Sequence, residues 1–361
     1  MFCWSRRRGV VSGSRVAVQT RRQCATRSAL VALACVVLLT RGASAQQSQR
    51  TWLAGTWTVV TSLPANPNLL SRPGNLACAD QAIYTYDFGD YSLKALSLTG
   101  APLWRTADVP GVTQDSTGGT RVQLAPDGRV WMTHSNMGVV FVFSSGGELL
   151  RTYHVAHGVW DVRPNRDGSF WTWNMRETVA TQYDSSGRSP HQPPHQPPHQ
   201  PLANMADNSA RMALLTSDDD GTLGVVFVLA NRLMLLDRHG KTIRSAPGVG
   251  APRDFPTMVA QTVQVAGRTI QGWHLGSASR IVAAAASADA NRLFILHGND
   301  STGATPANQT VDSYSMTDER YMGSYRLPEG LSELCVRGGS FIGLTDTSPP
   351  AFRVWKFVAR N

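Results

Sequence analysis

The first 45 residues contain no acidic side chain, although they carry eight arginines. This basic segment runs into eleven apolar residues, Ala29 to Leu39, and then reaches the small triplet Ala43-Ser44-Ala45. A basic region, a short apolar region and an A-x-A site are typical of an export signal. The apolar run is too short to span a bilayer, which takes about 20 residues. We therefore expect cleavage after Ala45 and a secreted or periplasmic mature protein without a transmembrane anchor; Cys35 leaves a lipoprotein as the less favoured alternative.

The mature chain, residues 46–361, has little net charge of either sign. The full chain has 34 basic and 25 acidic residues, and removal of the eight leader arginines leaves 26 against 25. The high isoelectric point of the full chain therefore results from the arginines of the leader. Nucleic-acid-binding domains carry a clustered basic surface, so a nucleic-acid partner is not expected.

Sequence motifs of several enzyme classes are also missing. The chain has no G-x-S-x-G elbow, no H-E-x-x-H zinc motif, no phosphate-binding loop and no paired C-x-x-C. Long stretches with helical periodicity are absent as well. Recognisable catalytic chemistry is therefore sparse in this chain.

A repeat of about 40 residues occupies most of the mature chain instead. Each unit has a polar turn ending in Gly, an apolar strand, a loop, a second apolar strand and another Gly turn. In three units the two glycines lie 19 residues apart, and a fourth fits the same frame from Gln81. The turns that open and close these units are Gln81 and Gly100, Gly128 and Gly147, Gly168 and Gly187, and Gly221 and Gly240. Short strands at this spacing predict four-stranded propeller blades.

Two further units complete the expected ring. One begins at Asp289 and another at Gly338, and the last ends at its third strand. The missing fourth strand is predicted to come from Thr51 to Ser62, which would join the first and last blades and remove the open sheet edges. We therefore predict an all-β, six-bladed propeller over residues 46–361. Residues 257–275 are expected to form an extra hairpin, and a seventh blade remains an alternative.

The blade sequence PDGRVWMTHS followed by FVFSSGGELL resembles the six-bladed propellers of the NHL-repeat and TolB-like group. That group contains binding scaffolds, lactonases and lyases, so the resemblance implies a fold and leaves the function open. Propeller lactonases carry a metal-binding Glu on the first inner strand. The corresponding strand here, Leu76 to Gln81, has none, which disfavours a lactonase.

The two cysteines of the mature chain, Cys78 and Cys335, fall on the inner strands of the first and sixth units. These units are neighbours if the ring closes, and export would place them in an oxidising compartment. We predict a disulfide that staples the closure. Two buried thiols are the alternative.

Long loops map to one face of the predicted disc, and loops on a rigid scaffold are where function concentrates. They are residues 188–211, 245–281 and 298–310, whereas the opposite face has only tight turns. We expect the loop-rich face to be the working surface. The candidate ligand-binding residues on it are His134, Asn136, His157, Trp160, Asp161, Asn174 and Arg176.

A Pro/His/Gln-rich insertion occupies residues 188–205, with the unit HQPP at His191 and again at His195. Proline at this density favours an extended, solvated segment. Its imidazoles would not share one face, so the insertion predicts a surface loop rather than a metal cage. No cofactor is predicted, and calcium at the three aspartates 218–220 is a less favoured alternative to ordinary turn chemistry.

Three functions follow from this sequence. The leading prediction is a non-catalytic scaffold that binds a protein, a glycan or a small molecule at the loop-rich face. The second is a lactonase-like hydrolase or lyase with a metal at the channel mouth, and the third is a structural protein of the envelope. Few acidic residues fall on predicted inner strands, so an enzyme ranks second.

Overall fold

A computed structural model describes most of residues 50–360. The described residues are 50–63, 69–106, 109, 110, 112, 119–175, 177–189, 212–217, 221–229, 232–249, 258–265, 268–275, 283–298 and 308–360. Residues 1–49, Arg176 and residues 190–205 of the Pro/His/Gln-rich insertion lie outside this set. No helix among the described residues is long and apolar enough to cross a membrane.

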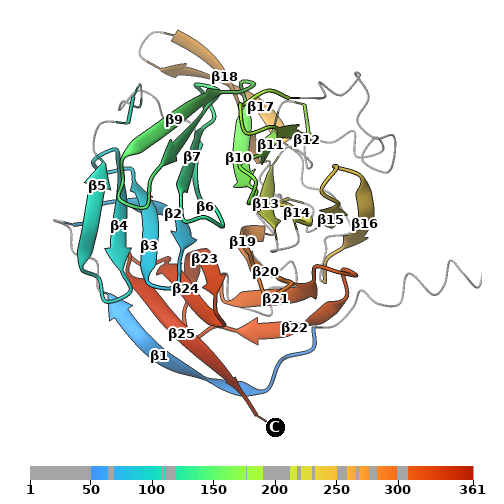
Figure 1. The fold of residues 1–361 in the computed structure, drawn as a ribbon. Helices are drawn as coiled ribbons and strands as arrows, with labels where there is room; N and C mark the ends of the chain where they lie inside the picture. Colours follow the sequence, from blue (N-terminus) through green and yellow to red (C-terminus); the bar gives the residue numbers. More distant parts are fainter. Residues whose placement is uncertain are drawn as a thin grey trace, which may run out of the picture. The chain divides into compact units, whose positions relative to one another are not determined.

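The chain is a six-bladed β-propeller (Figure 1). Its blades follow one another along the sequence, and each is an antiparallel sheet of consecutive strands that begins at the centre of the ring. The first blade is β2 (Pro73–Cys78), β3 (Ala82–Asp87), β4 (Ser92–Ser97) and β5 (Pro102–Thr106). The second is β6 (Thr120–Leu124), β7 (Val130–His134), β8 (Val139–Phe143) and β9 (Leu149–His154).

The next three blades repeat the pattern, and the structure describes three strands of one of them. The third blade has β10 (Val159–Pro164), β11 (Phe170–Asn174) and β12 (Val179–Tyr183). The fourth has β13 (Ala213–Ser217), β14 (Leu223–Phe227), β15 (Arg232–Leu236) and β16 (Thr242–Pro247). The fifth has β19 (Ala283–Asp289), β20 (Arg292–His297), β21 (Thr310–Ser315) and β22 (Tyr321–Arg326).

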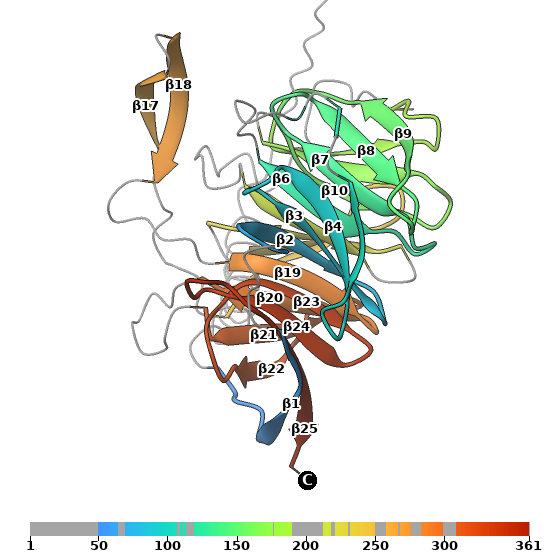
Figure 2. The same ribbon diagram turned by 90° about the vertical axis from the view of Figure 1, so that its left-hand side faces the viewer.

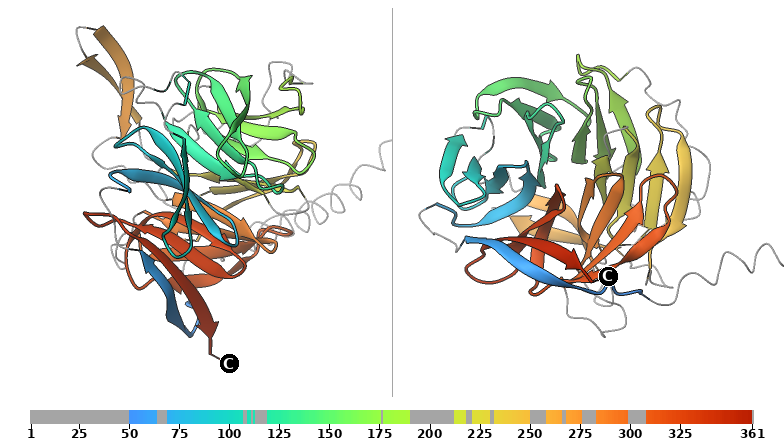
Figure 3. Two further views of the ribbon diagram at one scale, coloured as in Figure 1. Left: turned by 60° about the vertical axis from the view of Figure 1, so that its left-hand side comes forward. Right: turned by 60° about the horizontal axis from the view of Figure 1, so that its bottom comes forward.

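The sixth blade closes the ring with strands from both ends of the described chain. It contains β23 (Leu331–Arg337), β24 (Ser340–Thr345), β25 (Phe352–Ala359) and, outermost, β1 (Gly55–Leu63). Figure 3 shows β1 in blue beside β25 in red. Trp57 of β1 packs its ring against Phe341 and Phe357, and its indole Nε1 donates to the Arg326 carbonyl at 2.6 Å. The predicted closure by the N-terminal segment is thus confirmed.

The expected hairpin is also present, as β17 (Met258–Val265) paired with β18 (Arg268–Leu275). These two strands pair only with each other among the described strands. They therefore form an insertion between the fourth and fifth blades, and the six-blade prediction holds over the seven-blade alternative.

The tight turns explain why a unit has two glycines 19 residues apart. Gly128 and Gly147 have φ values of 84° and 88°, a region that side chains with a Cβ rarely adopt. Aspartates stabilise two turns of this kind: the Asp127 carboxylate accepts the Arg129 backbone N–H around Gly128, and the Asp167 carboxylate accepts that of Ser169 around Gly168. The Asp-Gly pair is therefore turn chemistry that repeats because the blade repeats.

The hydrophobic core is divided into six clusters, and each lies between two neighbouring blades. Alternate residues of one strand belong to different clusters, because successive side chains of a strand point to opposite faces. On β8, for example, Phe141 faces the first blade while Val140 and Val142 face the third. Figure 2 shows the blades from the side. This packing orients the six inner strands around a central channel.

Cys78 on β2 and Cys335 on β23 form a disulfide between the first and sixth blades, with 6.1 Å between their Cα atoms. The bond links residues 257 positions apart in the sequence. It joins inner strands at the junction that β1 closes from the outside.

Replacing both cysteines with alanine should lower the free energy of unfolding by about 2–5 kcal/mol, because the unfolded chain loses a long-range crosslink. Urea unfolding of the oxidised wild type and the double variant would measure this. The variant should still give the β-sheet circular dichroism of the wild type, since β1 still closes the ring. Equal urea midpoints for the two proteins would contradict a stabilising role.

Candidate functional site

The central channel contains a pocket of about 340 Å³ lined by all six inner strands. β2, β6, β10, β13, β19 and β23 contact one another in this cyclic order. Near its open end the pocket is lined by exposed turn residues such as Arg166, and its deeper end is lined by buried Asn75 and Asp161. The pocket therefore opens among the tight turns that connect the first two strands of each blade.

The sequence places polar side chains in this channel by simple alternation. On β6, Val122 belongs to the core between blades, while Arg121 and Gln123 line the pocket. On β10, Val162 is in the core, and Asp161 and Arg163 line the pocket. Every second residue of an inner strand points at the channel axis because the strand has a period of two.

Asp161 is the most deeply buried charged residue of the pocket, with 1% of its surface exposed. Its carboxylate accepts the backbone N–H groups of Val162 and Leu215, each at 2.8 Å, and the Gln123 amide at 3.2 Å. These partners lie on β10, β13 and β6, so one carboxylate ties three blades together. Burial raises the pKa of Asp161, and the nearby Arg121 guanidinium and the hydrogen bonds oppose that rise.

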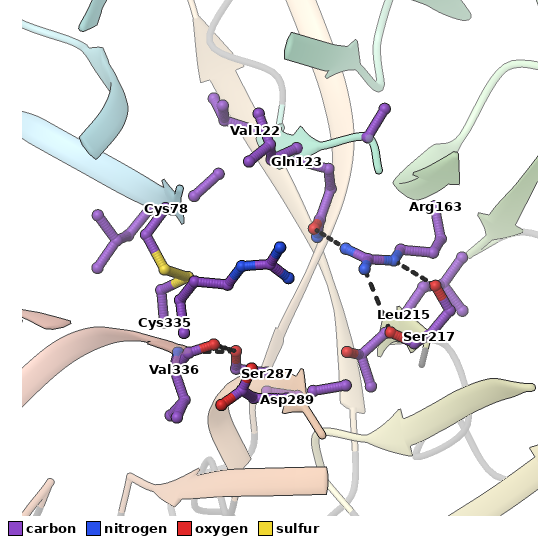
Figure 4. Close-up of a pocket in the computed structure, with 18 of the residues that line it drawn as sticks. Cys78, Val122, Gln123, Arg163, Leu215, Ser217, Ser287, Asp289, Cys335 and Val336 are labelled. Carbon is purple, nitrogen blue, oxygen red and sulfur yellow. Dashed lines mark hydrogen bonds between the residues drawn. A yellow bond between two sulfur atoms is a disulfide. The ribbon is translucent and has the colours of Figure 1, made fainter. Parts of the chain in front are cut away.

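Arg163 links the same strands from the next channel-facing position (Figure 4). Its Nε donates to the Ser217 hydroxyl at 2.7 Å, and one terminal nitrogen donates to the Ser217 carbonyl at 3.2 Å. The other terminal nitrogen donates to the Gln123 amide oxygen at 3.2 Å. Gln123 therefore connects Arg163 to Asp161, and this network gives the pocket wall a fixed pattern of donors and acceptors.

An ion pair of the pocket joins two blades that are not direct neighbours in the ring. A terminal nitrogen of Arg121 on β6 lies 3.3 Å from a carboxylate oxygen of Glu333 on β23, while β2 stands between these strands in the ring. The Trp160 ring centre lies 5.2 Å from the Arg121 guanidinium carbon, an arrangement that favours the cation. Both charged side chains are mostly buried, with exposed fractions of 15% and 17%.

The pKa of Glu333 is raised, chiefly because the carboxyl is buried. The negative charge of Asp161 raises the pKa further, while Arg121 and the Asn75 backbone N–H lower it. Two carboxyl groups thus face one guanidinium at the deep end of the pocket. A carboxyl group in this setting can exchange a proton closer to neutral pH than an exposed one.

The candidates named from the sequence fall into two groups. Asp161 and Trp160 are part of the channel network, the latter through its contact with Arg121. The other described candidates lie on the opposite side of the second and third blades: His157 Nδ1 is 3.3 Å from the Asn136 carbonyl oxygen, and the Asn174 amide donates to the His157 carbonyl at 3.2 Å.

The two exposed members of this second group are Asn136 and His157, whereas His134 and Asn174 are buried. Asn174 also accepts the Glu177 backbone N–H, so it fixes the connection between β11 and β12. Arg176 lies outside the described residues. A ligand role for this group stays a prediction.

Four residues of this site were not predicted from the sequence: Arg121, Gln123, Arg163 and Glu333. The signal that marks them is the alternation of polar and apolar residues on the first strand of each blade. Among the described residues, no group of three His, Cys, Asp or Glu side chains is placed to hold a metal ion.

No family model matches the sequence, and no curated protein matches it. Solved structures do resemble the fold. Virginiamycin B lyase from Staphylococcus aureus aligns with a TM-score of 0.50 at 12% identity, over 83% of this chain and 98% of that one. A catalytically inactive variant of that lyase with quinupristin aligns at 0.52 and 11% identity, over 84% and all of the two chains. The likeness is one of fold. At such low identity it does not carry the activity of the lyase to this propeller.

The pH dependence of stability should report the raised pKa of Glu333. Between its ordinary pKa of 4.5 and the raised value, the folded protein binds more protons than the unfolded chain, so this carboxyl lowers stability as pH rises. The wild type should therefore lose stability relative to Glu333→Gln as pH increases from about 4.5, by at most about 1.4 kcal/mol per pH unit.

Urea midpoints of both proteins at closely spaced pH values would test this. Glu329→Gln is the control for removal of a paired carboxylate, because Glu329 pairs with Arg353 at 2.9 Å outside the pocket. Parallel pH curves for the wild type and Glu333→Gln would show that this carboxyl has no raised pKa.

Proposed function

We propose that the protein is an exported propeller that binds a small polar ligand in its channel pocket. The observation that carries the proposal is the pocket itself, in which Arg163, Gln123 and Asp161 form a hydrogen-bonded network on the wall. Ligand sites are concave and carry a few fixed polar groups that orient the ligand. The pocket volume of about 340 Å³ lies at the small end of the range for such sites.

This proposal moves the binding site from the loop-rich face to the channel. The long connections of the loop-rich face lie mostly outside the described residues, so they supply no geometry for a site. A protein or glycan partner at that face stays a separate prediction. The channel is favoured because the groups of its wall network are held by hydrogen bonds among three blades.

An acid–base enzyme is the second candidate, and Glu333 is the observation that favours it. Its carboxyl group is partly accessible from the pocket, has a raised pKa and lies beside Arg121. Groups with these properties serve as general acids and bases. Binding ranks first because the structure places no nucleophile–base pair in the pocket among the described residues.

Export can be tested independently of binding. The basic leader, the small residues before Gln46 and the disulfide all support it. Expression of the full chain in a bacterium should yield periplasmic protein whose N-terminal sequencing begins at Gln46. Full-length protein retained in the cytoplasm would contradict this part of the proposal.

Binding can be tested by thermal denaturation of residues 46–361 against a panel of sugars, nucleosides, organic acids and amino acids. At least one class should raise the melting temperature, because a ligand at 100 times its Kd stabilises the folded state by about 2.7 kcal/mol. Arg163→Met should remove this ligand-induced shift, because it disrupts the network on the pocket wall.

The matched control is Arg320→Met. Arg320 is exposed and pairs with Asp318 in a turn outside the pocket, so this variant should keep the wild-type shift. Failure of every class to stabilise the wild type, or an equal shift in Arg163→Met, would rule out the channel as a binding site.

A further inference from the structure

The charges that line the channel pocket balance. Among its described lining residues are four arginines and four acidic residues. They are Arg121, Arg163, Arg166, Arg337, Asp80, Asp161, Asp289 and Glu333. A pocket with this composition has no net charge that would attract a simple anion or a simple cation.

The balanced charges differ in how strongly water screens them. Arg337 and Asp80 pair at 3.1 Å near the open end, where their side chains are 47% and 72% exposed. Arg121 and Glu333 pair at the deep end, where they are 15% and 17% exposed. Charges away from water interact more strongly with a ligand, so the deep pair dominates recognition.

The deep pair is also loose. Its nitrogen–oxygen distance of 3.3 Å exceeds the 2.7–2.9 Å usual for a strong charge-assisted hydrogen bond. Each partner is anchored separately, Arg121 by the Trp160 ring and Glu333 by the Asn75 backbone N–H. The guanidinium and the carboxylate are therefore each held in place by a contact of their own, and they present opposite charges to the pocket.

A ligand that enters this site meets a guanidinium and a carboxylate together. A ligand with a single charge would pair with one of them and deprive the other, which is mostly buried, of its present ion-pair partner, which is unfavourable. A ligand that carries both a carboxylate and an ammonium would satisfy both. We infer that the channel pocket binds a zwitterion of the amino-acid type, with its carboxylate on Arg121 and its ammonium on Glu333.

Asp161 supports this assignment from β10. Its charge acts on Glu333, and its own oxygens accept three hydrogen bonds from the protein. Asp161 therefore adds negative potential beside the ammonium without needing to contact it. This makes Asp161 a positioning residue, and Arg121 and Glu333 the ligand-binding pair.

The inference rests on the proposed function and specifies the class of ligand. Its test is isothermal titration calorimetry of residues 46–361 with the twenty L-amino acids. Each amino acid that binds is then compared with two analogues, the deaminated acid and the decarboxylated amine. Both analogues should bind at least about thirtyfold more weakly, because each leaves one member of the deep pair without a partner.

Two variants test the named residues. Arg121→Met and Glu333→Gln should each weaken amino-acid binding by about thirtyfold or more. Arg353→Met and Glu329→Gln are the matched controls, because this ion pair of 2.9 Å lies outside the pocket, and they should bind as the wild type does. The analogue comparison uses only wild-type protein, so it stands even if a variant fails to fold.

The direction of the pH dependence separates the ligand classes. Glu333 faces Arg121 from β6 and Asp161 from β10, while Asp289 of β19 and Arg337 of β23 lie toward the open end, and β2 and β24 carry no charged residue. Protonation of Glu333 removes the partner of the ammonium, so amino-acid binding should weaken as pH falls. Binding of a carboxylate alone should strengthen, because Arg121 is released.

Three outcomes are possible. Amino acids that bind with the expected analogue and variant losses support the inference. Stabilisation by another class, such as sugars or simple organic acids, without amino-acid binding overturns the inference and leaves the proposed function standing. An absence of binding by any class overturns both.

Discussion

The fold depends on closing the ring of six blades. An open arc of sheets would expose an apolar blade face at each end, such as the faces of the first and sixth blades that now pack against each other. The sixth blade avoids this by combining β23, β24 and β25 with β1 from the other end of the chain. Trp57 fixes β1 against the aromatic residues Phe341 and Phe357. The Cys78–Cys335 disulfide then joins the inner strands of the first and sixth blades.

Closure from both ends has a consequence for the channel. Every inner strand lies between two neighbouring inner strands of the ring. Its apolar side chains therefore pack between blades, and the side chains at alternate positions face the channel axis. Polar side chains at those positions are then confined together. Arg163 donates a hydrogen bond to Gln123, Gln123 donates one to Asp161, and Asp161 also accepts the Leu215 backbone N–H of β13. These hydrogen bonds offset the free-energy cost of burying the polar groups.

The deep ion pair differs from this wall network. The wall groups connect neighbouring strands, whereas Arg121 and Glu333 join β6 and β23, the two strands that flank β2. Their nitrogen–oxygen distance of 3.3 Å is longer than that of a strong charge-assisted hydrogen bond. These are the two charges that we infer to meet a ligand.

Much of the fold follows from the sequence, and much less of the site does. The glycines 19 residues apart predict the blades because each must adopt a positive φ in a tight turn, and this is a local property. The apolar, strand-forming segment around Trp57 likewise predicts the closing strand, because strand-forming character is also a local property. The candidates chosen by loop position fall in different places: Asp161 lines the pocket and Trp160 contacts Arg121, whereas His157 and Asn174 make loop contacts elsewhere.

The sequence by itself predicted six four-stranded blades, with a seventh as the alternative, and closure of the ring by the N-terminal strand. These features depend on turn chemistry and on the two-residue period of a strand. Only the tertiary structure decided which channel-facing residues meet. Arg121 and Glu333 are 212 residues apart, and no local pattern relates them. Their meeting depends on the curvature of the closed ring, which results from the packing of all six blades together.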